Sequence, residues 1–115
     1  IAQSPERKDV NSNKFIKYLL ELPDGITLIG QNAFWGCSAL KRLVIPEGVT
    51  KIDKNAFNGC KDLISITIPE SVNEIGIDIF VKCTFSILNV YTKNQTVIDY
   101  ITANYGDKIN VITEF

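Results

Sequence analysis

The stretch from Leu22 to Val44 reads LPDGITLIGQNAFWGCSALKRLV, and Ile45 to Thr67 follows at once as IPEGVTKIDKNAFNGCKDLISIT. A third unit, from Ile68 to Val90, reads IPESVNEIGIDIFVKCTFSILNV, so one pattern recurs every 23 residues. A repeat of this length is too short to bury its own apolar face, and it is stable only when neighbouring units stack on it. The sequence therefore predicts a stack of coils.

The first half of each unit combines a turn with an extended segment. Pro23, Pro46 and Pro69 end a strand because proline has no N–H to donate. An acidic residue and then glycine or serine follow, which is typical of a turn. The next apolar residues, such as Ile26 and Ile29, are three positions apart and cannot share one face of a regular strand. We therefore expect a bent extended segment packed on the core.

The middle of each unit predicts a short helical piece. Asn32, Asn55 and Asp78 occupy equivalent positions, each before an apolar pair that ends in phenylalanine. Asn or Asp at such a position is typical of a helix N-cap. Gly36 and Gly59 suit the left-handed residue that ends a helix. We expect about one helical turn in each unit.

The end of each unit alternates in polarity, as a half-buried strand does. Leu43 and Ile45 are expected to face the core, and Arg42 and Val44 to face outward. The third unit fits this pattern only if one residue before Phe85 is dropped. The expected strands, about 4.8 Å apart in a parallel sheet, cover approximately 18–22, 41–45, 64–68 and 86–91.

The combined pattern, L-x-x-L/I-x-I-P-D/E-G-V/I-T-x-I-x-x-x-A-F-x-G-C, resembles the BspA-type leucine-rich repeat. The resemblance covers residues 15–91 and implies an α/β solenoid, a short leucine-rich repeat array with a parallel sheet on one face. Proteins of that family are typically cell-surface or secreted and, where characterised, are associated with adhesion to host proteins or other cells. The resemblance thus implies a protein partner, such as a host extracellular-matrix protein. The motif is a scaffold motif and carries no catalytic residues to transfer.

Residues 92–115 leave the repeat and predict a C-terminal cap. Asn94 is expected to be the N-cap of a helix over about 95–105, which Gly106 ends, and a strand follows at about 109–115. A cap is needed because the last coil exposes apolar surface and an open sheet edge. Asn94 also begins a glycosylation sequon, which matters only in a eukaryotic secretory host.

The start of the chain differs from the repeats. Residues 1–14 are polar and show no periodicity, so we expect a disordered lead-in or an N-terminal cap. The chain begins at Ile1 and contains no methionine. These two features favour a processed or shortened segment, whose signal peptide would not be visible.

The cysteines Cys37, Cys60 and Cys83 predict a side-chain ladder through consecutive coils, with neighbouring Cα atoms close enough for a disulfide. We favour free thiols that face the interior as small hydrophobic groups. A zinc site is disfavoured because one cysteine per coil, in line with its neighbours, does not surround an ion.

A column of acidic residues, Asp24, Glu47 and Glu70, follows the prolines. Three stacked carboxylates could attract calcium. Calcium-binding repeats use several acidic side chains in each turn, and this repeat has one. We therefore favour solvated turn residues, and we expect no metal and no cofactor.

The outward strand positions are the best candidates for contact with a partner, because the curvature of stacked coils makes such a sheet a binding surface. They form two columns: Leu19, Arg42, Ser65, Ile87 and Glu21, Val44, Thr67, Asn89. Their mixture of apolar, charged and small polar groups resembles a protein-binding patch more than a sugar site. The same residues also fit a solvated sheet face without a partner.

Trp35 is a further candidate because its equivalents, Asn58 and Val81, are not aromatic. An exposed indole at this position is a plausible anchor for a partner. The alternative, which we favour slightly, is packing of the ring against a neighbouring coil.

Composition narrows the functional classes. The net charge of −1 provides no electrostatic footprint for nucleic acid or for a polybasic membrane binder. No stretch approaches the length of an apolar membrane span. The chain contains no histidine, the commonest general base and metal ligand, so we do not expect an enzyme. A binding module and a structural spacer of a longer protein remain, and the oligomeric state is open.

Overall fold

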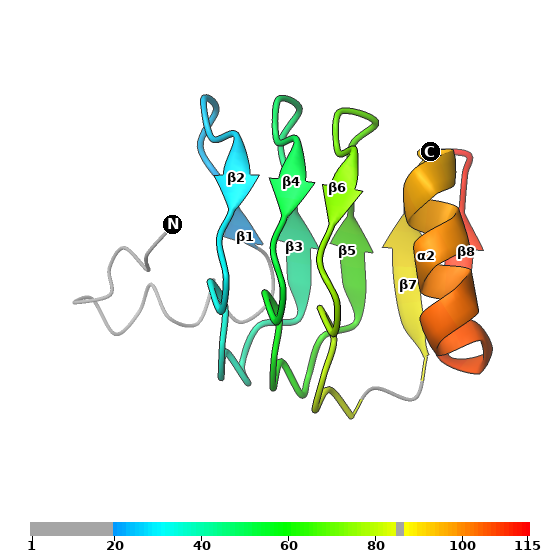
Figure 1. Cartoon of the computed structure of the whole chain (residues 1–115). Helices are drawn as coiled ribbons and strands as arrows, with labels where there is room; N and C mark the ends of the chain where they lie inside the picture. Colours follow the sequence, from blue (N-terminus) through cyan, green and yellow to red (C-terminus); the bar gives the residue numbers. More distant parts are fainter. Residues whose placement is uncertain (1–19, 85–86) are drawn as a thin grey trace.

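The computed structural model describes residues 20–84 and 87–115, and Figure 1 shows a stack of coils with a helix at one end. Predictions for residues 1–19, including Leu19 and the lead-in 1–14, lie outside the described residues, as does Phe85. Every coil passes through two extended positions and pairs there with its neighbours, so the stack carries two parallel sheets.

The larger sheet has five parallel strands in the order β1-β3-β5-β7-β8. Their bounds are Leu20–Glu21, Arg42–Val44, Ser65–Thr67, Leu88–Tyr91 and Ile109–Ile112. The first four lie within the ranges that the alternating pattern predicts, and the fifth ends before the expected residue 115. The inward residues Leu43, Ile66 and Val90 are buried, as the period of two requires.

The register of β7 corrects one prediction. Ser65 pairs with Asn89 and Ile66 with Val90, so these partners are 24 residues apart. The third unit is therefore one residue longer than the others at this point, whereas the sequence pattern predicts a unit one residue shorter. The observed partner of Ser65 is therefore two residues after the predicted partner, Ile87. A shift of two residues leaves each side chain on the same face of the sheet. Ile87 precedes β7 and is not in the column of Ser65.

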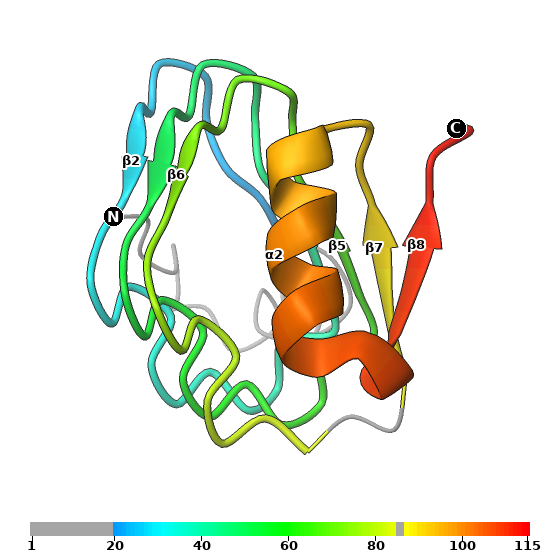
Figure 2. The same cartoon turned by 45° about the vertical axis from the view of Figure 1, so that its right-hand side comes forward.

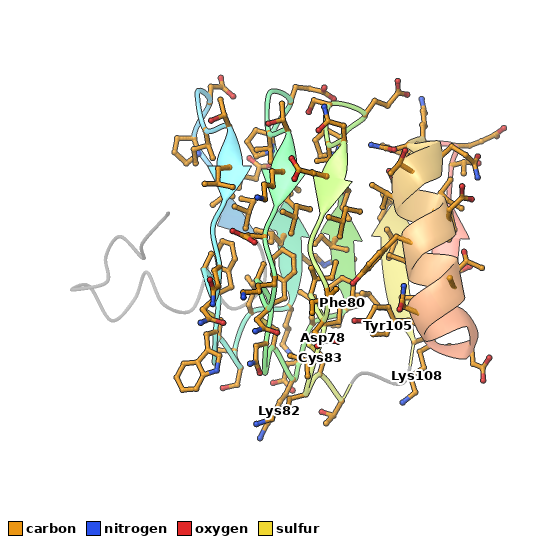
Figure 3. All side chains as sticks on the ribbon, in the orientation of Figure 1. Asp78, Phe80, Lys82, Cys83, Tyr105 and Lys108 are labelled. Atoms are coloured by element: carbon orange, nitrogen blue, oxygen red, sulfur yellow. The ribbon has the colours of Figure 1, made fainter. Side chains whose placement is uncertain are left out.

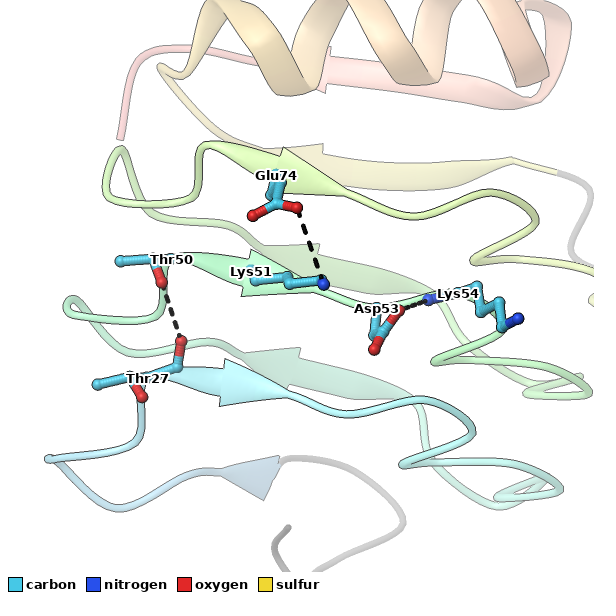
Figure 4. A network of polar contacts seen from close by, with 6 residues as sticks. All are labelled: Thr27, Thr50, Lys51, Asp53, Lys54 and Glu74. Atoms are coloured by element: carbon cyan, nitrogen blue, oxygen red, sulfur yellow. Dashed lines mark hydrogen bonds and ion pairs between the residues drawn. The ribbon is translucent and has the colours of Figure 1, made fainter.

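The smaller sheet consists of β2, β4 and β6, in that order. Their bounds are Leu28–Ile29, Lys51–Ile52 and Glu74–Ile75. The sequence predicts an extended segment here but not a second sheet. Figure 4 shows two contacts between neighbouring coils: Thr50 Oγ1 donates to the Thr27 carbonyl at 3.3 Å, and Lys51 Nζ lies 3.8 Å from Glu74 Oε2. This ion pair is solvent-exposed, and such pairs contribute at most about 1 kcal/mol.

The predicted helical turns are wrong. Asn32, Asn55 and Asp78 have φ of 60°, 58° and 57°, so they are left-handed turn residues and not N-caps. Asn and Asp tolerate this conformation better than other non-glycine residues. The segment that follows hydrogen-bonds between coils, as when Phe34 N donates to the Ala56 carbonyl at 2.8 Å. Alternate N–H groups, such as those of Phe34 and Gly36, therefore serve the next coil, while those between them close local turns, so no continuous helix forms.

Three phenylalanines form the centre of the core. The rings of Phe34, Phe57 and Phe80 stack through the three coils, with centroids 5.6 Å apart at both steps. All three side chains are buried. Burial of one such side chain stabilises a fold by about 1.5–3 kcal/mol, and a favourable ring pair adds about 0.5–1.5 kcal/mol. The recurring phenylalanine therefore holds consecutive coils together.

The helix α2, Gln95–Tyr105, covers the end of the stack at the place where a fourth strand of the smaller sheet would follow β6 (Figure 2). Asn94 is its N-cap and accepts a hydrogen bond from Val97 N at 3.3 Å. Gly106 has φ −29° and begins a 3₁₀ helix, Gly106–Lys108, so it is not the left-handed terminator that was expected. In the described ranges, 20–84 and 87–115, no helix has the length and apolarity to cross a bilayer.

Candidate functional site

The outer face of the larger sheet gathers most of the predicted partner-binding residues. The register places Arg42, Ser65 and Asn89 in one outward row, which continues to Asn110 in β8. The neighbouring row consists of Glu21, Val44, Thr67, Tyr91 and Ile112. Asn89 therefore belongs to the row of Arg42, and Tyr91 takes the place that the sequence pattern gave to Asn89.

Two hollows on this face share part of their lining. The larger, of about 400 Å³, lies where the strands end and is lined by Val44, Ile45, Pro46, Glu47, Thr67, Ile68, Pro69, Glu70, Lys93 and Phe115. The smaller, of about 210 Å³, is lined by Arg42, Leu43, Val44, Ser65, Thr67 and Tyr91. Because Val44 and Thr67 belong to both linings, we treat the two hollows as one site and call it the strand-face groove.

Phe115 forms one wall of the strand-face groove. Its ring packs edge-on against Tyr91, with centroids 5.7 Å apart and an angle of 84° between the planes. Lys93 Nζ lies 5.2 Å from the centroid of the same ring, which is a cation–π contact. The side chain is nevertheless 63% exposed. The sequence did not identify Phe115 as a site residue, because only the pairing of β8 with β7 brings the end of the chain to this face.

Two carboxylates, those of Glu47 and Glu70, line the end of the groove beyond the prolines. Both residues are exposed, and neither forms an ion pair in the part of the chain that the structure describes. Gly48 N donates to Ser71 Oγ at 3.1 Å, which holds the two turns side by side. No cluster of three or more potential metal ligands occurs among the described residues. The two carboxylates therefore give this end of the groove negative charge.

A family model for the BspA type leucine-rich repeat region matches residues 10–109 with six copies. The chain belongs to the BspA-type leucine-rich repeat family. No curated protein and no solved structure matches the chain. Members of the family are repeat modules that are generally non-enzymatic, and leucine-rich repeat modules generally bind proteins. Together with the two parallel sheets and the C-terminal helix, the match establishes an α/β repeat fold.

Trp35 lies in the turn region of the first BspA-type unit and is 65% exposed. The expectation that its ring packs against a neighbouring coil is therefore wrong. Beside it is a hollow of about 260 Å³, whose lining includes Gly36, Gly59 and the lysines Lys61 and Lys82. The indole is free to act as an anchor, but it does not belong to the strand-face groove.

The cysteines of the BspA-type units are free thiols, as favoured from the sequence. Cys60 Sγ donates to the Phe34 carbonyl at 3.3 Å, and Cys83 Sγ donates to the Phe57 carbonyl at 3.1 Å. Desolvation by burial raises the pKa of Cys60 to about 12, and it also raises the pKa of Cys37 and of Cys83. The thiolate is the nucleophilic form, so raised pKa values make these groups poor nucleophiles.

Cys37 is an exception to the predicted burial. It is exposed as a residue, although partial desolvation still raises the pKa of its thiol. The prediction that every sulfur faces a packed interior is therefore wrong for the first unit. We expect Cys37 to be the most accessible of the three thiols.

A cavity of about 500 Å³ lies between the third unit and the cap. Its lining includes Phe80, Cys83 and Tyr105, with Asp78, Lys82 and Lys108 around it (Figure 3). The Tyr105 hydroxyl accepts a hydrogen bond from Phe80 N, and Cys83 donates to a backbone carbonyl. The central polar groups of this cavity, those of Tyr105 and Cys83, thus form hydrogen bonds that hold the cap and the repeats together.

Proposed function

We propose that this chain is a non-enzymatic protein-binding module of a cell-surface or secreted protein, and that its partner binds in the strand-face groove. In this proposal residues 15–91 form a short solenoid and residues 92–115 form its cap. The partner class that fits the family is a host extracellular-matrix protein or another cell-surface protein, so adhesion is the proposed role.

The observation that carries the proposal is the groove itself. An apolar wall built by Phe115 and Tyr91 lies next to polar side chains such as Arg42, Ser65 and Thr67. Protein interfaces combine aromatic anchors at the centre with a polar rim in this way.

The test is binding to a panel of immobilised extracellular-matrix proteins. Arg42→Glu combined with Val44→Asp changes the groove without touching a buried side chain, so we expect loss of binding with little change in melting temperature. A matched control combines Leu28→Asp with Lys54→Glu; Leu28 lies in the smaller sheet and Lys54 in the turn after β4, and both are exposed. It should bind as the unchanged chain does.

Two outcomes would count against the proposal. If the folded protein binds no member of the panel, the structural spacer of a longer protein becomes the better interpretation, with recognition elsewhere. If a partner binds but only Trp35→Ala abolishes binding, the partner uses the exposed indole and the groove is not the site.

A further inference from the structure

The structure points to a particular occupant of the strand-face groove, and this inference rests on the proposed function. We infer that the groove takes an extended apolar segment of the partner that carries an arginine or lysine, with the cationic group between Glu47 and Glu70. The inference goes beyond protein binding in general, because it specifies the charge and the polarity pattern of the bound segment.

The lining of the groove defines the apolar part of the occupant. Val44 lies on the floor, Pro46 and Pro69 follow at the strand ends, and Phe115 forms the wall. Two of these groups are prolines, which have no backbone N–H to solvate. Such a lining fits small apolar or β-branched side chains, whose burial removes apolar surface from water.

The carboxylates of the groove define the charge expected of the bound segment. Glu47 and Glu70 occupy equivalent positions in neighbouring coils, held together by the hydrogen bond from Gly48 N to Ser71 Oγ. Neighbouring coils are separated by about 4.8 Å, and both glutamates line the same end of the groove. A single guanidinium can hydrogen-bond to two carboxylates through its fork of N–H groups. A cation from the partner would therefore find two carboxylates that form no ion pair among the described residues.

The cations already present in the groove do not neutralise this pair. Lys93 Nζ lies over the Phe115 ring, 5.2 Å from its centroid, and it forms no ion pair with a described carboxylate. Arg42 lines the smaller hollow, together with Ser65 and Tyr91, and not the end that the prolines and glutamates build. The proline end of the groove therefore has two carboxylates and one lysine, and the other end has Arg42, so an anionic segment fits the proline end poorly.

Fluorescence anisotropy with labelled peptides tests the inference. The probe is a short peptide of alternating valine and threonine with a central arginine, and its partner peptide has glutamate at the centre. We expect the arginine peptide to bind at least about tenfold more tightly. The difference should shrink when the salt concentration rises from about 50 mM to about 500 mM, because screening weakens exposed charge pairs.

Variants of the protein test whether Glu47 and Glu70 cause the preference for the arginine peptide. Glu47→Gln together with Glu70→Gln should weaken binding of the arginine peptide by about tenfold and leave the glutamate peptide unchanged or slightly tighter. The matched control is Asp24→Asn, which removes a carboxylate from the same column but outside the groove. Circular dichroism melts check that all variants are folded.

The possible results separate the two proposals. Equal binding of the two peptides, or no binding of either, would overturn the inference about charge. If a matrix protein binds and the Arg42/Val44 variant abolishes that binding, the proposed function stands even when the glutamine pair has no effect. If the Arg42/Val44 variant has no effect on a bound partner, the groove is not the site and both proposals fail.

Discussion

The backbone N–H of Phe80 donates to the hydroxyl of Tyr105, with 3.4 Å between the two heavy atoms. In the two preceding coils the equivalent N–H groups, those of Phe34 and Phe57, donate to a backbone carbonyl of the next coil. The Tyr105 ring also continues the phenylalanine stack, 5.5 Å from Phe80 and at an angle of 71°. One side chain of the cap therefore replaces both the acceptor and the ring that a fourth coil would provide.

The two contacts of Tyr105 with Phe80 predict how variants of Tyr105 change stability. Tyr105→Phe keeps the ring but loses the acceptor, and we expect a loss of about 0.5–1.5 kcal/mol in the free energy of unfolding. Tyr105→Ala removes the ring as well and should cost about 3–5 kcal/mol. Urea denaturation measures both values. Tyr91→Phe, on the outer face, is the matched control and should change stability little. Equal stability of the Tyr105→Phe variant and the unchanged protein would show that the hydroxyl is not needed for capping.

Asn94 caps the stack as well as the helix. Its Nδ2 donates to the carbonyls of Pro69 and Val72, at 3.2 and 2.6 Å, and is 3.4 Å from that of Glu70. Its Oδ1 accepts from Val97 N, and the residue is only 7% exposed. The amide therefore satisfies acceptors of the last turn that a fourth coil would otherwise cover.

The second prediction follows because a glycan attached to Asn94 Nδ2 would replace one of its two donor hydrogens and would have no space beside a residue that is only 7% exposed. In a eukaryotic secretory host we expect the folded fraction to carry no glycan, and any glycosylated fraction to be misfolded. Mass spectrometry of soluble and aggregated protein measures this. Thr96→Ala removes the sequon at an exposed position, so it should raise the folded yield. A glycosylated chain with an unchanged melting temperature would contradict the prediction.

An Asn94→Asp variant separates the two roles of this residue. Aspartate is as good an N-cap as asparagine, so capping of α2 alone predicts little change. The carboxylate would instead face the carbonyls of Pro69 and Val72 without a donor, and an unsatisfied buried group costs about 1–3 kcal/mol. We therefore expect clear destabilisation in a thermal melt at neutral pH.

The sequence predicted the larger sheet because period-two alternation and the proline columns act locally, and the buried Leu43 and Ile66 agree with it. It missed the smaller sheet because two-residue strands contain too little alternation to recognise. Asn32 was misassigned because asparagine favours both N-caps and left-handed turns, so the residue type alone does not separate them.

The candidate site was predictable only in part. Arg42, Val44, Ser65 and Thr67 share a face as expected, since their placement follows from the repeat. The wall formed by Phe115 depends on the pairing of Tyr91 with Ile112, which joins the last strand of the repeat to a segment outside it. Local patterns contain no information on such a long-range pairing.

Gly76 supports a further prediction, because the backbone of Asp53 and Lys54 in the second coil lies against it. A Cβ added there would lie 2.8 Å from Lys54 Cα, and Gly76 N donates to the Ile52 carbonyl at 2.8 Å. We expect Gly76→Ala to destabilise the protein by about 1–3 kcal/mol, as overpacking against backbone does. Gly30 is the equivalent residue of the first coil, and no described atom lies within 4 Å of its added Cβ. Gly30→Ala should therefore be neutral or slightly stabilising, and similar losses for both variants in urea denaturation would contradict this account.

The buried thiol of Cys60 makes stability depend on alkaline pH. Its pKa rises from an ordinary value of 9.0 to about 12 because burial disfavours the thiolate. Below pH 9 the thiol is protonated in both states and adds no pH dependence. Between pH 9 and about 12 the unfolded chain loses this proton and the folded chain retains it, so the free energy of unfolding falls. We expect Cys60→Ala to reduce this slope, and the slope is measured by urea denaturation across the alkaline range. Cys37 and Cys83, whose pKa values burial also raises, keep part of the slope in the variant, and so does Tyr105, whose pKa burial raises from 10.0 to about 12. A slope in the Cys60→Ala variant equal to that of the unchanged protein would show that burial of Cys60 does not contribute to the alkaline loss of stability.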